Sequence, residues 1–327
     1  MIQEPGTEST LAGAAVTVVV PVYNSERTLE ELCTRLIATL KACGLAYEII
    51  LVNDGSPDRS WERIRQCADK FEHIRGFNFM RNYGQHNALL CGIRMANHDI
   101  TVTLDDDLQN PPEEIPTLLD HLTPDTDVVY GSPDVEQHGF LRDAASQLTK
   151  LALQRGMGAE TARHISAFRV FRTPLREGFA DYRGSFVSID VLLTWSTTRF
   201  KSIRVKHLPR EVGESNYTVR QLTTHALNIV TGFSTLPLRI ASVVGFSFTL
   251  FGVSVLLFVL LRVLLEGTAV PGFAFLASII AIFSGAQLFS IGVIGEYLAR
   301  MHFRAMDKPS YVIQDRAESL VESVEPD

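Results

Sequence analysis

The chain has 327 residues, of which 46% are hydrophobic, enough for one sizeable domain and a further segment. Its formal net charge is -7 and its basic residues are scattered, which argues against nucleic-acid binding. The four cysteines have irregular spacing and no CxxC pair, so we expect reduced cytosolic thiols rather than disulfides or a zinc site. Residues 1–15 lack a basic segment followed by an apolar run, so we expect a flexible leader there and no signal peptide.

The first half of the chain alternates short apolar runs with helical patterns. The apolar runs predict buried strands at 16–23, 48–52, 74–79, 100–104 and 127–131. The helical patterns start near Ser25 and cover 60–71 and 87–96. This alternation predicts an α/β domain with a Rossmann-like, mostly parallel sheet, whose ligands would bind beyond the carboxyl ends of the strands. No G-x-G-x-x-G follows the first strand and no P-loop occurs, which argues against a nicotinamide site or a P-loop site.

Polar residues follow the predicted strands, most notably after the fourth. Residues 101–104 lead into Asp105, Asp106, Asp107 and Gln109, and prolines then begin a helix. Oxygen ligands at a strand end suit Mg²⁺ or Mn²⁺, which are often held by one or two carboxylates together with substrate phosphates. The alternative is a solvated acidic turn that caps the next helix.

After the fifth strand the pattern is less regular. We expect helices at 140–154 and 186–195 and strands at 167–172 and 202–208. Apolar residues then recur at helical spacing over 218–238, which indicates an amphipathic helix. Beside a membrane it would lie in the interface, and otherwise it would pack in a core.

Two long segments contain no charged residue, 240–261 and 267–295. Each is long enough to cross a membrane, so we predict transmembrane helices at 240–264 and 271–295, with a pair of buried core helices as the alternative. Basic residues flank the pair at Arg239, Arg300, Arg304 and Lys308. The positive-inside rule therefore predicts a multi-pass protein of the cytoplasmic membrane with both chain ends in the cytosol. Residues 296–327 would form a cytosolic juxtamembrane segment and an acidic tail, disordered from residue 315 onward.

Several of these motifs occur in an order that resembles a known family. The motifs are VVVPVYN, EIILVNDGS, RNYGQHNALLCG, TLDDDLQNPPEEIP, REVGESNY and IGEYLAR. Together they resemble the family 2 glycosyltransferases, and within them the polyprenyl-phosphate glycosyltransferase group. The resemblance implies a GT-A domain over 16–217. It also implies inverting, metal-dependent transfer of a sugar from a nucleoside diphosphate, with UDP expected, to polyprenyl (undecaprenyl) phosphate.

The resemblance assigns a nucleotide-sugar site to the ends of the first two strands. Pro21, Tyr23 and Glu26 would line the nucleoside pocket, and Asp54 would reach the uracil or ribose, both of which offer hydrogen-bond donors. The family often has two acidic residues before the Gly-Ser pair, whereas this chain has Asn53 first. A plain Asx-turn into the next helix would also explain Asn-Asp-Gly-Ser.

The same resemblance assigns the catalytic acidic residues Asp105 and Asp107, which with Gln109 would hold Mg²⁺ or Mn²⁺ against the diphosphate. Asp105 would also contact the nucleotide-sugar. Asp106 stands where the family usually has a small residue, and we expect it to have a structural role. Arg81, Asn82 and His86 belong to a polar segment at a helix start, which suits anions or hydroxyls.

The acceptor phosphate needs placement rather than a general base, because with a second pKa near ~6 it is largely ionised at neutral pH. The resemblance implies that Arg142 and Arg210 act as catalytic residues that hold this phosphate, with Ser215 and the weaker candidate Arg169. Lys150 is weaker still. A surface salt bridge is the alternative reading for each arginine.

Three functions stay open at this point. The first is the polyprenyl-phosphate transfer described above, in a homo-oligomer that the resemblance suggests is a tetramer on the lipid bilayer. The second is elongation of a lipid-linked or cell-envelope glycan, since Pro133 lies where many relatives carry an arginine. The third is an inactive membrane-anchored protein that binds nucleotide-sugar. The sugar itself cannot be read from these motifs.

Overall fold

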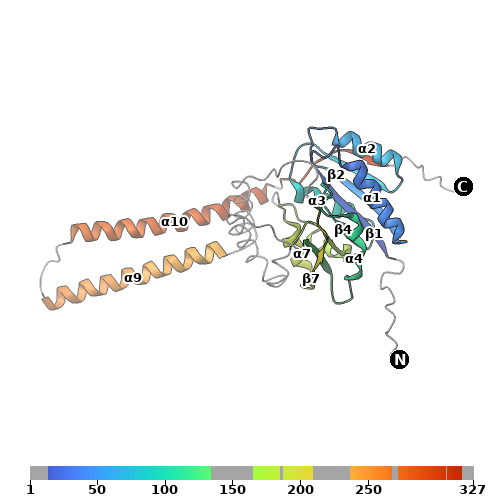
Figure 1. Ribbon diagram of the computed structural model, residues 1–327. Coiled ribbons are helices and arrows are strands. Elements are labelled where there is room, and N and C mark those ends of the chain that lie inside the picture. The colour runs from blue at the N-terminus through green and yellow to red at the C-terminus, as the bar shows by residue number, and fades with distance from the viewer. Residues whose placement is uncertain are drawn as a thin grey trace, which may run out of the picture. The chain divides into compact units, whose positions relative to one another are not determined.

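The computed structural model describes residues 14–133, 165–184, 187–208, 236–266, 272–306 and 308–318. The chain forms two compact units, one made of Met1–Leu222 with Lys308–Asp327 and the other of Thr223–Asp307. The first unit contains an α/β sheet and the second contains two long helices (Figure 1). The amphipathic helix predicted at 218–238 and the helix predicted at 140–154 lie almost wholly outside the described residues.

The sheet of the first unit has eight described strands in the order β7-β5-β6-β4-β1-β2-β3-β8. Their bounds are β1 Ala15–Val22, β2 Ala46–Asn53, β3 Ile74–Phe79, β4 Ile100–Thr103, β5 Val128–Pro133, β6 Arg169–Arg172, β7 Phe200–Val205 and β8 Ile313–Glu318. The pairs β1–β2, β1–β4, β2–β3 and β5–β7 are parallel, whereas β6 and β8 run antiparallel to their neighbours. The expected mostly parallel sheet is confirmed.

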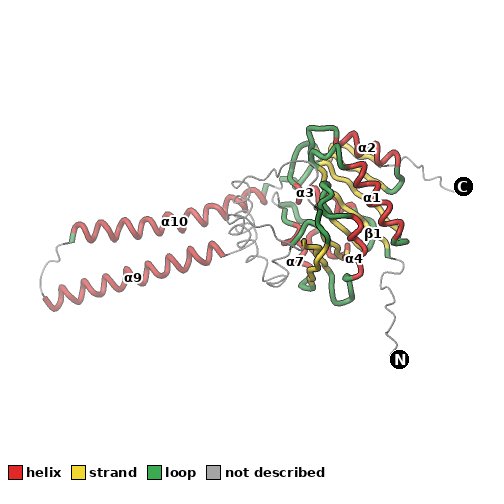
Figure 2. The backbone as a smooth tube through the Cα atoms, viewed as in Figure 1, coloured by secondary structure: helices red, strands yellow, loops and turns green. Residues whose placement is uncertain are grey.

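Helices cover both faces of this sheet (Figures 1 and 2). They are α1 Leu29–Ala42, α2 Ser60–Lys70, α3 Gln85–Met95, the short turn η1 Pro112–Glu114 with α4 Ile115–Asp120, the turn η2 Thr173–Phe179, and α7 Ile189–Ser196. One core packs α1, α2 and α4 against alternate residues of β1 and β2. The other packs α3 and α7 against the opposite face, because successive strand side chains point to opposite sides.

The C-terminal strand β8 corrects one prediction. We expected disorder from Asp315 onward, but residues 313–318 pair with the edge of β3. The polar side chains of this strand find partners there. Glu318 forms an ion pair with Arg75 at 3.3 Å, and the Arg316 guanidinium lies over the Phe77 ring. The strand also contributes Ile313 and Ala317, which pack against the two cores.

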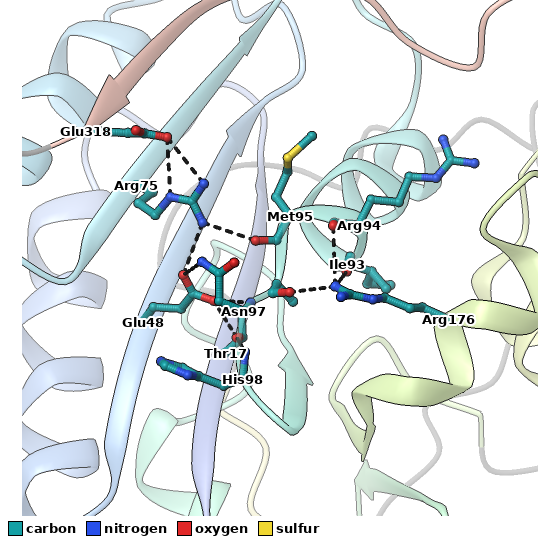
Figure 3. A network of polar contacts seen from close by, with 11 residues as sticks. Thr17, Glu48, Arg75, Ile93, Arg94, Met95, Asn97, His98, Arg176 and Glu318 are labelled. Atoms are coloured by element: carbon teal, nitrogen blue, oxygen red, sulfur yellow. Dashed lines mark hydrogen bonds and ion pairs between the residues drawn. The ribbon is translucent and has the colours of Figure 1, made fainter.

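The buried carboxylate of Glu48 connects the amino ends of neighbouring strands of the sheet (Figure 3). Glu48 accepts hydrogen bonds from the Thr17 hydroxyl at 2.7 Å and from the backbone N–H of Asn97 at 2.6 Å. It also forms an ion pair with Arg75 at 3.2 Å, through which β8 joins the network. Burial opposes its ionisation, but these donors hold the pKa of Glu48 below its usual value. These polar groups at the amino ends of the strands are therefore paired with one another within the fold.

The second unit contains α9 Leu236–Glu266 and α10 Phe273–Ala305, which lie side by side (Figure 1). They include apolar windows at Ile240–Arg262, with mean hydropathy 2.5, and at Ile282–Ala299, with mean hydropathy 1.3. By length and composition each could cross a membrane. Neither window is buried within the described structure, which argues against the alternative of two core helices. Gly252 lets the Phe283 ring approach α9 closely, as small residues do where membrane helices pack.

Candidate active site

Three loops meet at the carboxyl ends of β1, β2 and β4. The register of the parallel pairs places Val22 beside Asn53 and Val19 beside Thr103, so the segments that follow these strands emerge at one edge of the sheet. In open α/β sheets this edge is where ligands bind. The predicted nucleotide and metal residues Tyr23, Asp54 and Asp105 therefore belong to neighbouring loops.

Asp106 joins two of these loops. Its carboxylate accepts the backbone N–H of Tyr23 at 3.0 Å and a short hydrogen bond from the Ser25 hydroxyl. Burial, together with the neighbouring charge of Asp107, raises the pKa of Asp106 to about 6 against the lowering effect of those two donors. Asp106 thus fastens the turn after β1 to the acidic loop after β4, which fits the structural role expected for it.

The carboxylates on either side of Asp106, Asp105 and Asp107, accept hydrogen bonds from a side-chain amide and from a backbone N–H, respectively. The Gln85 side-chain amide donates to Asp105 at 2.5 Å, and the Gln109 backbone N–H donates to Asp107 at 3.1 Å. Directly after Asp107, Leu108 is buried with φ 60, in the left-handed region that few side chains of this kind adopt. Such strain persists only where the surroundings impose it, and it is common at functional sites. The turn therefore fixes where both carboxylates lie.

The side chains of this loop offer only some of the oxygen ligands that a hard divalent cation needs. The described residues include no group of three or more His, Cys, Asp or Glu side chains able to hold a metal. Asp105, Asp107 and Gln109 supply oxygen ligands, and Mg²⁺ is often held by one or two carboxylates with the remaining ligands from substrate phosphates and water. These residues therefore fit an ion that arrives with, or is completed by, a diphosphate.

Asp54 directly follows β2 and holds the loop of residues 81–84 by hydrogen bonds. Its two oxygens accept the backbone N–H groups of Tyr83 at 2.6 Å and Gly84 at 2.8 Å. The side chain is 3% exposed, and burial raises its pKa to about 6 although both donors lower it. Next to it Gly55 has φ 63, and a Cβ there would collide with the backbone of Arg81. Only glycine allows the 81–84 loop to approach this closely.

The remaining predicted nucleotide residues lie around the turn after β1. Pro21 is buried within the strand, whereas Tyr23 is 43% exposed. Glu26 accepts the backbone N–H of Arg59 at 3.1 Å, and its own N–H donates to Asp58 at 3.2 Å. Tyr23 is therefore the aromatic side chain of this set that is open to a ligand.

Arg169 does not lie where a lipid phosphate could reach it without rearrangement. Its side chain is buried, with 1% of the residue exposed, and its guanidinium forms an ion pair with Asp190 on α7. It also donates to the Thr103 hydroxyl at 3.1 Å, and the Tyr130 hydroxyl donates to Asp190 at 2.9 Å. The positive charge of Arg169, a weaker candidate for binding the lipid phosphate, is therefore paired with Asp190 inside the domain.

Several predicted residues lie outside the described residues, namely Arg142, Arg210, Ser215 and Lys150. Of the polar segment at the start of α3, His86 accepts the backbone N–H of Ile189 through Nδ1 at 3.3 Å. Arg81 lies over the Tyr83 ring at 4.2 Å. His86 therefore contacts α7, whereas Arg81 packs within its own loop.

Sequence reasoning missed two residues, Gln85, which the structure brings into the candidate site, and Asp190, which pairs with Arg169 inside the domain. Gln85 was quoted within the RNYGQH motif but received no role, although it donates to Asp105. Asp190 was not singled out, because an acidic residue in the first turn of a helix is common and does not by itself indicate a buried basic partner. Both contacts join distant parts of the chain, so local patterns do not reveal the partner.

Comparison with known proteins agrees with this fold and shows the family. The sequence profile described as Glycosyl transferase family 2 matches residues 17–180. An undecaprenyl-phosphate 4-deoxy-4-formamido-L-arabinose transferase of Pseudomonas paraeruginosa is 37% identical over 302 residues, 91% of this chain and 89% of that protein. A protein of the same name from Edwardsiella ictaluri is 36% identical over 315 residues, 95% of this chain and 96% of that one.

A solved structure supports the architecture. Glucosyl-3-phosphoglycerate synthase from Mycobacterium tuberculosis, crystallised with phosphoglyceric acid, superposes with a TM-score of 0.51 at 18% identity. The match covers 71% of this chain and 84% of that one. At this identity the likeness concerns the fold alone, and it confirms the expected GT-A-like α/β domain.

Proposed function

Because the chain belongs to the family 2 glycosyltransferases and fits their polyprenyl-phosphate group, we propose that it transfers a sugar from a nucleoside diphosphate to undecaprenyl phosphate. UDP is the proposed nucleotide, and direct displacement by the acceptor phosphate would invert the anomeric carbon. The observation that carries the proposal is the meeting of Asp54, Asp105 and Asp107 at the ligand-binding edge of a chain whose full-length relatives are named for this acceptor.

The leaving diphosphate gains negative charge as the bond to the sugar breaks. A bound Mg²⁺ or Mn²⁺ would neutralise part of that charge. Asp105 and Asp107, with Gln109, are the residues proposed to hold it. Gln85 orients Asp105 by hydrogen bonding, and the Gln109 backbone N–H orients Asp107, so neither carboxylate has to be ordered when the donor binds.

The nucleoside is proposed to bind at the turn after β1. Tyr23 offers an exposed ring for stacking, with Pro21 and Glu26 in the same segment. Asp54 keeps further lone pairs on both oxygens, which can accept from uracil N3–H or from ribose hydroxyls. Its pKa of about 6 leaves it mostly ionised at neutral pH.

The acceptor is proposed to attack without a general base, because its phosphate is already ionised. Arg142 and Arg210 are proposed to hold its oxygens bidentately, with Ser215 as a further hydrogen-bond donor. Arg169 is left out of this set because its guanidinium is paired with Asp190.

The membrane arrangement is proposed from the connectivity of the chain. The strand β8, which follows α10, belongs to the same sheet as β1 to β7, which precede α9. Both outer ends of the helix pair therefore lead to one folded unit, as expected if the chain crosses the bilayer twice. The flanking basic residues support a cytosolic position for that unit. The tetramer that the resemblance suggests stays a prediction, which light scattering on the purified protein in detergent would test.

The full-length protein, reconstituted in nanodiscs with undecaprenyl phosphate and a panel of labelled UDP-sugars, tests the proposal. We expect a lipid-linked product that mass spectrometry identifies as a single sugar on the monophosphate, and its loss when a chelator is added. Asp107→Ala should lower the rate by roughly 100-fold or more, whereas Asp69→Ala, an exposed acidic residue of α2, should leave it unchanged.

Failure to form any lipid-linked sugar across the panel, or full activity of Asp107→Ala, would contradict the proposal. A product with two or more sugars would favour glycan elongation, the function to which Pro133 points. UDP binding by calorimetry without turnover would favour the inactive nucleotide-sugar-binding protein.

A further inference from the structure

The segment that follows α10 is built into the catalytic unit beside the proposed nucleotide site. Ser310 is 6% exposed, and its hydroxyl donates to the Gly184 carbonyl at 2.9 Å. Two residues later the Val312 carbonyl accepts the backbone N–H of Met80 at 3.1 Å. Met80 directly precedes the 81–84 loop that Asp54 fastens. The C-terminal segment therefore reaches the loop that carries part of the site.

Tyr311 makes the main side-chain contact at this point. Its ring stacks on Phe79 with centroids 5.1 Å apart and an interplanar angle of 7°. Phe79 is 1% exposed, and its ring also makes an edge-to-face contact with the Tyr83 ring, with centroids 5.7 Å apart. The Arg94 guanidinium lies 5.9 Å from the Tyr311 ring. Phe79 is therefore held between an aromatic ring of the C-terminal segment and one of the site loop.

From the Tyr83–Gln85 segment three further contacts lead to the acidic residues. The backbone N–H groups of Tyr83 and Gly84 donate to Asp54, and the next residue, Gln85, donates to Asp105. A series of direct contacts thus runs from Tyr311 through Phe79 and Tyr83 to carboxylates proposed to bind the nucleotide and the metal.

The other end of β8 is fixed independently of this contact. Arg75 pairs with Glu318 at 3.3 Å and with the buried Glu48 at 3.2 Å (Figure 3). The strand pairing also shifts register between Asn78 and Phe79, at the end nearer the site. Such bulges are common next to active sites and redirect a side chain. The strand is thus anchored at its far end, and the irregularity at its near end lets Tyr311 lie on Phe79.

We propose that Tyr311 is a positioning residue for sugar transfer. By packing on Phe79 it holds the Tyr83–Gln85 segment in the geometry that presents Asp54 and Asp105 to the donor. This inference rests on the proposed function for its effect on catalysis. It makes the segment after the helix pair part of the active-site support, beyond its place in the sheet.

The test compares three variants of the full-length protein. Tyr311→Ala removes the ring, Tyr311→Phe keeps the stacking surface, and Val312→Ala is the matched control, because Val312 is adjacent and 40% exposed and its contact to Met80 uses the backbone. Two measurements are made on each: amide hydrogen exchange of residues 81–87, and KM and kcat for the nucleotide-sugar.

In Tyr311→Ala we expect exchange of the Tyr83 and Gly84 amides to accelerate by roughly tenfold, the scale of losing an aromatic pair. The KM for the donor should rise by a similar factor at nearly unchanged KM for undecaprenyl phosphate. Tyr311→Phe should stay within about twofold of wild type in both measurements. A purely structural role would instead lower the melting temperature and the active fraction and leave the KM of the surviving enzyme alone.

Wild-type exchange and wild-type kcat/KM in a folded Tyr311→Ala protein would overturn the inference, as would equal effects of Val312→Ala. The exchange measurement needs no substrate. Absence of transfer by the wild-type protein would therefore contradict the proposed function, while the exchange result would still decide whether Tyr311 holds the loop.

Discussion

Replacing Asp54 by Asn separates the stability of the fold from the function of the site. At neutral pH the buried Asp54 carboxylate is mostly ionised, with its pKa raised to about 6. A carboxyl that titrates near 6 rather than near ~3.9 costs about 3 kcal/mol when it is charged. Asn removes that cost. It also replaces one accepting oxygen by an amide, so that one of the two backbone N–H groups at 2.6 and 2.8 Å loses its acceptor.

An unmet buried N–H costs about 1–3 kcal/mol, which offsets most of the relief from charge burial. Asp54→Asn should therefore fold with a stability within about 2 kcal/mol of wild type. The 81–84 loop would lose one of its two attachments, and the donor would lose a charged acceptor. We expect the affinity for UDP, measured by calorimetry, to fall by roughly tenfold or more, on the scale of one hydrogen bond to a charged group.

The pH dependence of stability gives a second measure. Between about pH 4 and pH 6 the folded chain binds the Asp54 proton more tightly than the unfolded chain, so stability falls as the pH rises through that window. From pH 7 to pH 5 this one group adds about 1.3 kcal/mol, and Asp106, with the same pKa of about 6, adds a similar amount. Asp54→Asn should remove about half of this combined increase, a difference of roughly 3–5 °C in Tm.

Scanning fluorimetry of the full-length protein in detergent at pH 5 and pH 7 measures this difference. Asp69→Asn, on the exposed side of α2, is the control for a general change of charge. The reasoning is refuted if Asp54→Asn and wild type gain equally on acidification, or if the variant binds UDP as tightly as wild type.

Two further variants test neighbouring contacts. Asp106→Ala removes the acceptor of the Tyr23 N–H and the Ser25 hydroxyl, so it should weaken binding of the nucleotide-sugar by roughly tenfold. Asp106→Asn keeps one acceptor and should lose less affinity. Equal losses of affinity for the two variants in calorimetry would show that these hydrogen bonds do not matter for binding. Asp190→Ala leaves the buried Arg169 guanidinium without its counter-charge and should destabilise the domain by about 3–5 kcal/mol. The double variant Asp190→Ala with Arg169→Met should recover much of that loss. A double variant no more stable than the single one in thermal unfolding would count against a buried ion pair.

The sequence predicts the strands of the parallel half of the sheet to within about two residues, because each is a short apolar run followed by polar residues. It does not predict that β6 inserts antiparallel between β4 and β5. Nothing in the local pattern of residues 169–172 encodes which edge they pair with. The strand β8 was missed for a related reason, since Glu318 and Arg316 find their partners in Arg75 and Phe77 on β3, which are distant in the sequence.

The candidate site shows the same division. The position of Asp105 and Asp107 after a buried strand can be predicted from the local pattern, whereas their roles and that of Asp54 come from the resemblance and stay predictions. The burial of Arg169 could not be predicted, because the sequence shows a charge but not its partner, and Asp190 lies on a different element. The different contacts of Asp105 and Asp106 likewise follow from which loops approach them. Residue type and position along a strand can be read locally, whereas the partner of a buried charge depends on topology.

The position of β8 also bears on how the domain is completed. The ion pair between Arg75 and Glu318 joins residues 243 apart in the sequence, and the whole helix pair lies between them. Until residues 313–318 are made, the edge of β3 is unpaired, and exposed strand edges invite wrong pairing. Closing so distant a contact is slow, because the loop-closure entropy is lost before the pairing offsets it. Tyr311 reaches Phe79 through this same late strand. The loop that carries Tyr83 and Gln85 would therefore gain its support last, after both long helices have been synthesised.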